Sequence, residues 1–288
     1  MLKITLQIKI TLLFISILLI ILSGIYLIFL PQVEENIKDQ AKNNLENIAI
    51  NTAGYLDHLI EDEINKITVL SKNPVLKSTG ASTSEKIGEL TLYKTQYRTF
   101  DEITLLDTNG TVVGSTDYNY RGDWKTKSWY QEALQGNIVI TDAHVILDPW
   151  KLVVLVLSPI KNYNESIIGV VSGQIDLEHY WNLVDEIEVG ETSQIKIIND
   201  NGKILYHANR SKIFSKISEN TPIYYLDFSD LGSSEYIDEY NVTFICGYTP
   251  FLKHTIYNNT GSWHMMVSQQ ESEILSGLSD FKQNIFYG

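Results

Sequence analysis

Cysteine and the motifs of catalytic or metal sites are scarce in this chain of 288 residues. The single cysteine, Cys246, excludes an intrachain disulfide framework and a cysteine-based zinc site. The histidines show neither HExxH nor another close ligand spacing, and the G-x-S-x-G and GxxxxGK[ST] motifs are absent from the sequence. The sequence therefore predicts a protein that is not an enzyme and holds no metal or other cofactor.

Positive charge is also in short supply. Lysine and arginine number 22 against 35 aspartates and glutamates, which gives a net charge of -13 at pH 7 and a pI near 4.9. Nucleic acid is not an expected partner, because phosphate binding needs a basic surface. The hydrophobic content of 44% is ordinary for a chain that buries a core. The length fits one or two domains.

Long hydrophobic runs are limited to one, from Ile10 to Leu30, which contains no charged residue. At about 1.5 Å per residue, such a helix spans the roughly 30 Å hydrocarbon core of a bilayer. Lys3 and Lys9 precede it and acidic residues follow, so the positive-inside rule predicts residues 1–9 in the cytoplasm and the chain after 30 outside it.

A cleaved signal peptide is the alternative interpretation of this run. Against it, the run is longer than the usual apolar core of a signal peptide, and no A-x-A cleavage site follows. We therefore expect a single, uncleaved transmembrane helix over residues 10–30. The protein would lie in the cell membrane, crossing it once, with most of its mass extracytoplasmic.

Residues 31–75 carry a helical pattern. Apolar residues recur mostly every three or four positions from Val33 to Leu70, and charged residues fill the other faces. Gly54 is the weak point, and Pro74 ends the pattern. Two helices with a break at 51–54 are the alternative. We expect one long stalk helix that packs on its own domain and on a partner chain, and so a homodimer.

A strand-turn-strand pattern occurs twice. Ile103 to Val113 and Ile195 to Leu205 both read apolar-x-apolar-apolar-(Asp/Asn)-x-Asn-Gly-x-apolar-apolar, 92 residues apart (195 minus 103). Apolar runs on either side of Asn-Gly are a strong hairpin signal. Two copies in register predict two copies of one α/β unit, although two similar tight turns could also arise by chance.

The stretch 117–148 lies between the hairpins and mixes aromatic with basic residues. Tyr118, Tyr120, Trp124, Trp129 and Tyr130 alternate with Arg121, Lys125 and Lys127. Aromatic walls with a few fixed charges suit a small-molecule pocket, because rings bury apolar area and a cation orients an anionic group. The alternative is a surface loop whose tryptophans cover the edge of a core.

These features together resemble the double Cache (dCache) extracellular sensor domain of prokaryotic chemoreceptors, sensor kinases and diguanylate cyclases. The resemblance spans nearly the whole chain, and its most specific residues fall at 106–113, 120–123, 127–133, 136, 153–160 and 168–171. It implies an α+β fold with an N-terminal transmembrane helix, a long stalk helix and two tandem PAS-like units with antiparallel sheets. The units would cover 76–185, membrane-distal and ligand-binding, and 186–270, membrane-proximal, followed by a helix over 271–288 that returns toward the membrane.

The resemblance also implies a ligand site in the membrane-distal unit. The amino-acid-binding subfamily uses an Arg-x-Trp-Tyr motif for the ligand carboxylate, and downstream Tyr and Asp residues for its ammonium. This sequence keeps Trp129 and Tyr130 but has Lys127 in place of the arginine. It has His144 near the expected tyrosine and Gln174 near the expected aspartate, with Asp176 two residues further on. Because lysine neutralises a carboxylate without clamping it, a carboxylate-bearing ligand is expected.

Other residues are weaker candidates for the same site. Tyr118 and Arg121 are included in the expected ligand-binding set. Asp142, His144 and Asp148 could line the mouth of the site, although an exposed loop is the favoured interpretation of these three residues. The function expected is an extracytoplasmic sensor that binds a small molecule in the distal unit and signals across the membrane. A structural or partner-binding ectodomain without a small ligand is the alternative. The output domain and the identity of the ligand are not readable from the sequence.

Overall fold

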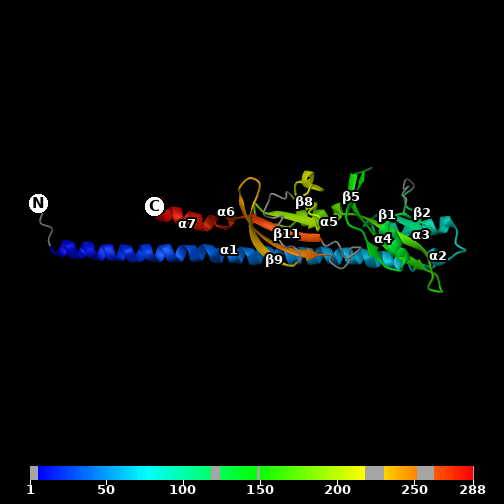
Figure 1. The fold of residues 1–288 in the computed structure, drawn as a ribbon, viewed down its shortest axis with the longest axis horizontal. Coiled ribbons are helices and arrows are strands. Elements are labelled where there is room, and N and C mark those ends of the chain that lie inside the picture. Colours follow the sequence, from blue (N-terminus) through cyan, green and yellow to red (C-terminus); the bar gives the residue numbers. More distant parts are fainter. Residues whose placement is uncertain (1–5, 118–123, 148–149, 218–229, 252–262, 288) are drawn as a thin grey trace.

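A computed structural model describes residues 6–117, 124–147, 150–217, 230–251 and 263–287. A single helix, α1 (Leu6–Leu70), runs the length of the molecule, and the rest of the chain is arranged along it (Figure 1). The helix is continuous through both Pro31 and Gly54, so the apolar run and the stalk form one element without a break at 51–54. The expected α+β fold with a long N-terminal helix and two antiparallel sheets is confirmed.

The two halves of α1 differ in what covers them. Large apolar side chains between Ile10 and Phe29 are exposed, and this segment is long and apolar enough to cross a membrane. Further along, one stripe of the helix is buried against the rest of the chain. That stripe comprises Leu45, Ala49, Ala53, Leu56, Ile60, Ile67 and Leu70. The spacing of three, four and seven places these residues on one face, which is the pattern of a helix packed on a domain.

The first unit, at the end of the molecule far from the N-terminus, is a six-stranded antiparallel sheet (Figure 1). Its strand order is β2-β1-β6-β5-β3, with β4 paired to β5. The strands are β1 (Phe100–Leu106), β2 (Val112–Ser115), β3 (Val139–Ile140), β4 (His144–Leu147), β5 (Trp150–Lys161) and β6 (Ile167–Asp176). Helices α1, α2 (Pro74–Lys77) and α3 (Thr83–Gln96) contact these strands, and α4 (Ser128–Leu134) contacts β3, β5 and β6.

The second unit is a five-stranded antiparallel sheet in the order β8-β7-β11-β10-β9. Its strands are β7 (Gln194–Asn199), β8 (Ile204–His207), β9 (Gly232–Ile237), β10 (Thr243–Phe251) and β11 (Trp263–Gln270). A short 3-10 helix, η1 (Arg210–Lys212), follows β8, and α5 (Glu178–Asp185) joins the two units. In each unit we call the face packed on α1 the inner face and the opposite one the outer face.

The duplicated hairpin is confirmed in atomic detail. Both copies carry a register shift at the same place, after Leu105 and after Ile197. Both turns are closed by a side-chain oxygen that accepts two backbone N–H groups, from Asp107 in one copy and Asn199 in the other. The glycines of the two Asn-Gly pairs have φ of 80° and 71°, a left-handed conformation that glycine adopts without steric cost.

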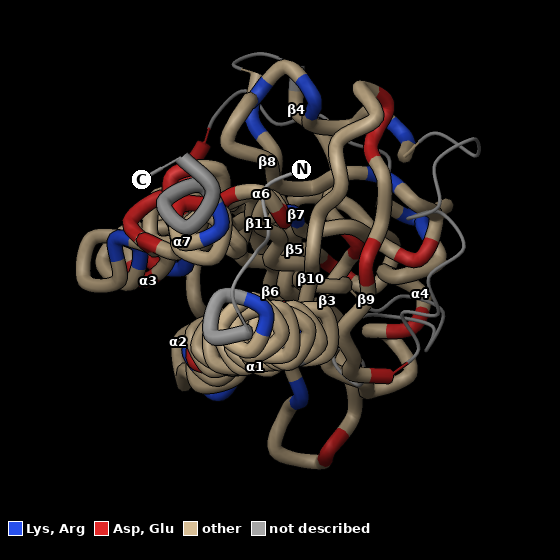
Figure 2. Tube along the Cα trace, turned by 90° about the vertical axis from the view of Figure 1, so that its left-hand side faces the viewer, with Lys and Arg blue, Asp and Glu red and all other residues tan. Residues whose placement is uncertain are grey.

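The chain returns along α1 after the second sheet. Helices α6 (Glu271–Ile274) and α7 (Ser276–Tyr287) follow β11, and Lys282 on α7 forms an ion pair with Glu34 of α1 at 3.1 Å. Figure 2 looks along α1 from the end where the chain begins and shows α7 beside it. The expected C-terminal helix is therefore present as two short helices, and both chain ends lie on the same side of the molecule (Figure 1).

Asp142, in the loop after β3, ties the two units together. One carboxylate oxygen accepts a hydrogen bond from the Trp263 indole N–H at 3.0 Å, and the other accepts from the Asn199 amide at 3.0 Å. Trp263 and Asn199 are both buried, so the partners have no access to bulk water. The sequence favoured an exposed loop for Asp142, with the mouth of a ligand pocket as the other possibility; the residue lies instead at the contact between the units.

We expect Asp142→Ala to destabilise the protein by about 2 kcal/mol, because it leaves a buried indole N–H and a buried amide without an acceptor. For a chain of this size that lowers the melting temperature by about 5 °C. Asp142→Asn should cost less, since it keeps one acceptor, and Asp280→Ala, at an exposed position on α7, should cost almost nothing. Equal melting curves for Asp142→Ala and Asp280→Ala would contradict this role.

Candidate functional site

The outer face of the first unit carries a group of buried polar side chains, here named the polar patch. Its members come from three adjacent strands and are Glu102, Thr104, Ser115, Ser172 and Gln174. The strand register places Thr104 between Ser115 and Ser172, and Glu102 beside Gln174. Side chains alternate between the two faces of a strand, so the intervening Ile103 and Leu105 point into the core on the inner face.

Glu102 is the centre of the polar patch. Its Oε1 accepts hydrogen bonds from the Thr104 hydroxyl at 2.6 Å and the Ser115 hydroxyl at 2.8 Å. Its Oε2 makes no hydrogen bond to another described residue, and the buried Ser172 hydroxyl likewise has none. Buried polar groups are usually hydrogen-bonded, so the unpartnered Ser172 hydroxyl, which lies opposite Thr104 on the same sheet face as the buried Glu102 carboxylate, calls for an explanation.

Aromatic side chains lie on the same face of the sheet. Trp124, Tyr130 and the partly buried Trp129 pack with Leu155 and other apolar residues of the outer face. The rings of Trp124 and Trp129 meet edge to face, with centroids 5.2 Å apart. Tyr130 is wholly buried, and its hydroxyl donates to the backbone carbonyl of Asp107 in the first hairpin turn. Helix α4 is thereby fixed to the hairpin and holds Trp129 toward the sheet.

Lys127 supplies an exposed positive charge next to α4 and near His144. Lys127 is exposed and immediately precedes α4. Burial lowers the pKa of His144, on β4, and the nearby charge of Lys127 lowers it further, against the opposing influence of Asp142. His144 is thus held as a neutral imidazole close to Lys127. An anionic ligand group at Lys127 would therefore find a cation and a neutral hydrogen-bonding ring.

The remaining residues predicted for the ligand site lie in different places. Gln174 is a buried member of the polar patch. Asp176, at the end of β6, pairs with Lys151 at 3.1 Å and accepts the Glu178 backbone N–H. Trp129, Tyr130 and Gln174 thus share the outer face, and Asp176 follows Gln174 on the same face of β6, at the end of the strand next to α5. Tyr118, Arg121 and Asp148 lie outside the described residues.

Sequence reasoning missed four members of the polar patch: Glu102, Thr104, Ser115 and Ser172. The signal was present in β1, where Glu102 and Thr104 alternate with the apolar Ile103 and Leu105. Alternation of this kind ordinarily indicates a strand with one solvent-facing side. Here both sides are buried, which only the packing of α4 and the neighbouring strands reveals. Among the residues that the structure describes, no three His, Cys, Asp or Glu side chains are placed to hold a metal ion.

A comparison with protein families matches residues 33–278 to the Cache domain. The chain belongs to the Cache domain family. The two units in tandem confirm the double Cache form that the sequence resembles. Within that frame, the polar patch lies on the outer sheet face of the first Cache unit.

Proteins similar to this Cache chain include chemoreceptors. The methyl-accepting chemotaxis protein McpG of Pseudomonas putida is 21% identical over 209 residues, which are 72% of this chain but 32% of that protein. The chain thus spans about a third of the length of that relative. The ligand-binding domain of the Pseudomonas aeruginosa PAO1 amino acid chemoreceptor PctC, in complex with GABA, has a TM-score of 0.67 and 18% identity, covering 80% of this chain and all of that one. The ligand-binding domain of the Campylobacter jejuni chemoreceptor Tlp3, in complex with 4-methylisoleucine, has a TM-score of 0.66 and 17% identity, covering 83% and 94%.

Proposed function

We propose that this protein is a membrane-anchored, non-catalytic sensor whose first unit binds a small molecule carrying both a carboxylate and a positively charged amine. The observation that supports it best is the buried Glu102 carboxylate beside the unpartnered Ser172 hydroxyl. A buried carboxylate is costly unless it is paired, and a ligand ammonium would pair it. Solved relatives of similar fold bind GABA and an amino acid derivative, which agrees with this ligand class.

The ligand would lie with its two charges at opposite ends of the site. Its ammonium would meet Glu102 and Ser172 on the sheet, and its carboxylate would meet Lys127 at the rim with His144 as a neutral neighbour. Trp129, packed against the outer-face cluster, would cover the apolar part of the ligand. Lysine holds a carboxylate as a point charge rather than as a bidentate clamp, so this end of the site would tolerate ligands of different lengths.

The remaining architecture fits transmembrane signalling. Residues 10–30 would span the membrane, with unit 76–185 distal to it and unit 186–270 proximal. Beyond that span, α1 also exposes Ile50, Tyr55 and Val69, which lie outside its buried stripe. We propose that α1 pairs with the same helix of another copy through such exposed apolar side chains, so that the sensor is a homodimer.

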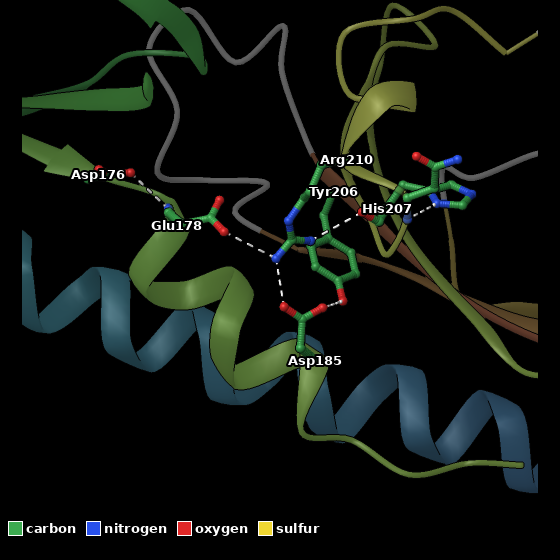
Figure 3. A network of polar contacts seen from close by, with 7 residues as sticks. Asp176, Glu178, Asp185, Tyr206, His207 and Arg210 are labelled. Carbon is green, nitrogen blue, oxygen red and sulfur yellow. Dashed lines mark hydrogen bonds and ion pairs between the residues drawn. The ribbon is translucent and has the colours of Figure 1, made fainter. Parts of the chain in front are cut away.

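A network of polar contacts offers a route from the site to the second unit (Figure 3). Asp176 accepts the backbone N–H of Glu178 at 2.9 Å, at the start of α5. Arg210 of the second unit pairs with Glu178 at 3.3 Å and with Asp185, at the other end of α5, at 2.6 Å. A ligand that shifts the end of β6 would move α5 and, through Arg210, the second sheet on α1. Its differential affinity for the two arrangements would set the size of the signal.

The proposal is tested by calorimetry and thermal shift on the full chain in lipid nanodiscs. The panel contains amino acids, ω-amino acids, and for each the matching carboxylate without the amine and the amine without the carboxylate. We expect a binder with both groups, whose melting temperature shift grows with concentration. Lys127→Ala should weaken it about tenfold, while Lys72→Ala, at an exposed lysine just after the end of α1, should leave it unchanged. If only the amine-free carboxylates bound saturably, or if no member of the panel bound, the proposal would be contradicted. A partner-binding ectodomain would then be favoured.

A further inference from the structure

The second unit contains a cavity of about 540 Å³ on the outer face of its sheet. The internal repeat relates the position of this cavity to that of the polar patch in the first unit. With the offset of 92 residues, Lys196 stands where Thr104 stands in the first unit, and His207 stands where Ser115 does. The strand register agrees, because Lys196 is paired with His207 just as Thr104 is paired with Ser115. The cavity therefore lies on the part of the second sheet that corresponds to the polar patch of the first.

The polar patch of the first unit and the cavity of the second unit differ in the sign of their charge. The first unit presents Glu102 with hydroxyls, whereas the cavity of the second unit is lined by Lys196, Lys212, Lys216 and His207. Such a cluster of basic side chains is unusual for a chain with a net charge of -13. Two acidic residues, Asp238 and Glu239, also line the cavity, and Glu239 pairs with Lys212 at 3.7 Å.

Lys196 has no carboxylate partner among the described residues. Its ammonium lies 5.7 Å from the centroid of the Tyr236 ring, and the side chain is half-buried. Burial, together with the nearby charge of Lys212, lowers the pKa of Lys196 to about 8. A cation held in partly apolar surroundings without a counter-ion is stabilised by an anion that enters beside it.

His207 is a neutral imidazole that can donate a hydrogen bond. The backbone N–H of Asn209 donates to Nδ1 at 2.9 Å, so the proton of the neutral ring sits on Nε2. Burial and the neighbouring charge of Lys196 lower the pKa of His207 to about 4, which keeps the ring neutral at physiological pH. The amide side chains of Gln194 and Gln270 supply further donors to the cavity wall.

The rest of the wall is apolar. Ile204, Ile217, Val242, Phe244 and the ring of Tyr236 contribute to it. A volume of this size suits a molecule of several carbon atoms better than a bare inorganic ion. We propose that the second unit binds a small organic carboxylate with an apolar body, whose carboxylate pairs with Lys196 and accepts from His207. This site is separate from the one in the first unit and extends the proposed function to a second, anionic signal.

The test uses the full chain in nanodiscs with hexanoate and benzoate as probes, and with hexanamide and benzamide as uncharged controls. Calorimetry at pH 7 is expected to show saturable binding of a carboxylate at least tenfold tighter than its amide. Lys196→Met should weaken carboxylate binding at least tenfold, and Lys72→Met should not change it. His207→Gln, which keeps a donor, should cost less than Lys196→Met and checks the site if the lysine variant folds poorly.

Dependence on pH adds an independent measurement. The groups that face Lys196 are Tyr236, Asp238, Glu239, Cys246, His207 and Lys212. Because the bound anion favours the ammonium form, carboxylate affinity should be constant below about pH 8 and fall as Lys196 loses its proton above it. Glu102→Gln should leave carboxylate binding intact, which separates this site from the one in the first unit. Equal affinity for carboxylate and amide, preference for inorganic phosphate, or unchanged binding in Lys196→Met would overturn the proposal.

Discussion

Replacing Glu102 with glutamine is expected to weaken binding of an amine-bearing ligand by about 100-fold, equivalent to about 2.7 kcal/mol. The substitution keeps the shape and an oxygen acceptor for Thr104 and Ser115, but it removes the negative charge that an ammonium would pair with. A charge-assisted hydrogen bond in a buried site contributes roughly 1.5–3 kcal/mol, and removing one partner also leaves the other charge uncompensated.

The measurement is calorimetry with the tightest binder of the panel, on the full chain in nanodiscs. Glu61→Gln is the matched control, because Glu61 is an exposed glutamate on α1 away from the polar patch. Ser172→Ala should weaken the same ligand by about tenfold, since it removes a hydroxyl that has no partner within the described structure. If Glu102→Gln bound the ligand as tightly as Glu61→Gln does, the ammonium would have to sit elsewhere.

The largest loss of stability is expected from Gly247→Ala. Gly247 lies in the middle of β10, where that strand crosses α1, and a Cβ there would overlap the backbone of Glu46 and Leu45. Backbone atoms cannot rotate away as a side chain can, so the helix and the sheet would have to separate. Overpacking in a well-packed core costs about 1–3 kcal/mol when side chains can shift, and we expect about 4 kcal/mol here.

Thermal unfolding of the full chain measures the melting temperature of each variant. Gly247→Ala should lower the melting temperature by about 10 °C. Gly173→Ala should have a smaller effect, because the added Cβ would meet the movable side chains of Ile67 and Phe100. Gly277→Ala on α7 is the control; it meets no atom within 4 Å and should leave stability equal or slightly higher. Similar melting temperatures for the variants at 247 and 277 would show that α1 does not pack as closely as described.

The turns of the two hairpins could be predicted from their local sequence. Asp107-Thr108-Asn109-Gly110 and Asn199-Asp200-Asn201-Gly202 specify tight turns because a side-chain oxygen closes each turn and glycine supplies the left-handed φ. These interactions span four residues or fewer, so no distant part of the chain decides them. The apolar run of α1 and its buried stripe were predictable for the same reason, since helical periodicity is a local property.

The ligand site was only partly predictable. Trp129 and Tyr130 stand out in the sequence as part of an aromatic and basic stretch, and the family resemblance pointed to Lys127, His144 and Gln174. Glu102 and Ser172 lie 70 residues apart in sequence (172 minus 102), yet they occupy neighbouring strands of one sheet face. Nothing local distinguishes them from polar residues on a solvated strand, because their burial depends on which distant segments pack over the sheet.

By itself, the sequence determined the membrane-length helix, its continuation as one long helix, the repeated hairpin and the lack of an intrachain disulfide. Each of these follows from composition or from patterns shorter than a few turns. Only the tertiary structure decided that Asp142 joins the two units, that Gly247 lets α1 touch the second sheet, and that Glu102 is buried while Lys196 lines a cavity. Whether a polar side chain faces water or an interior depends on which distant segments pack over it, and pairing across a sheet joins residues that the chain keeps far apart.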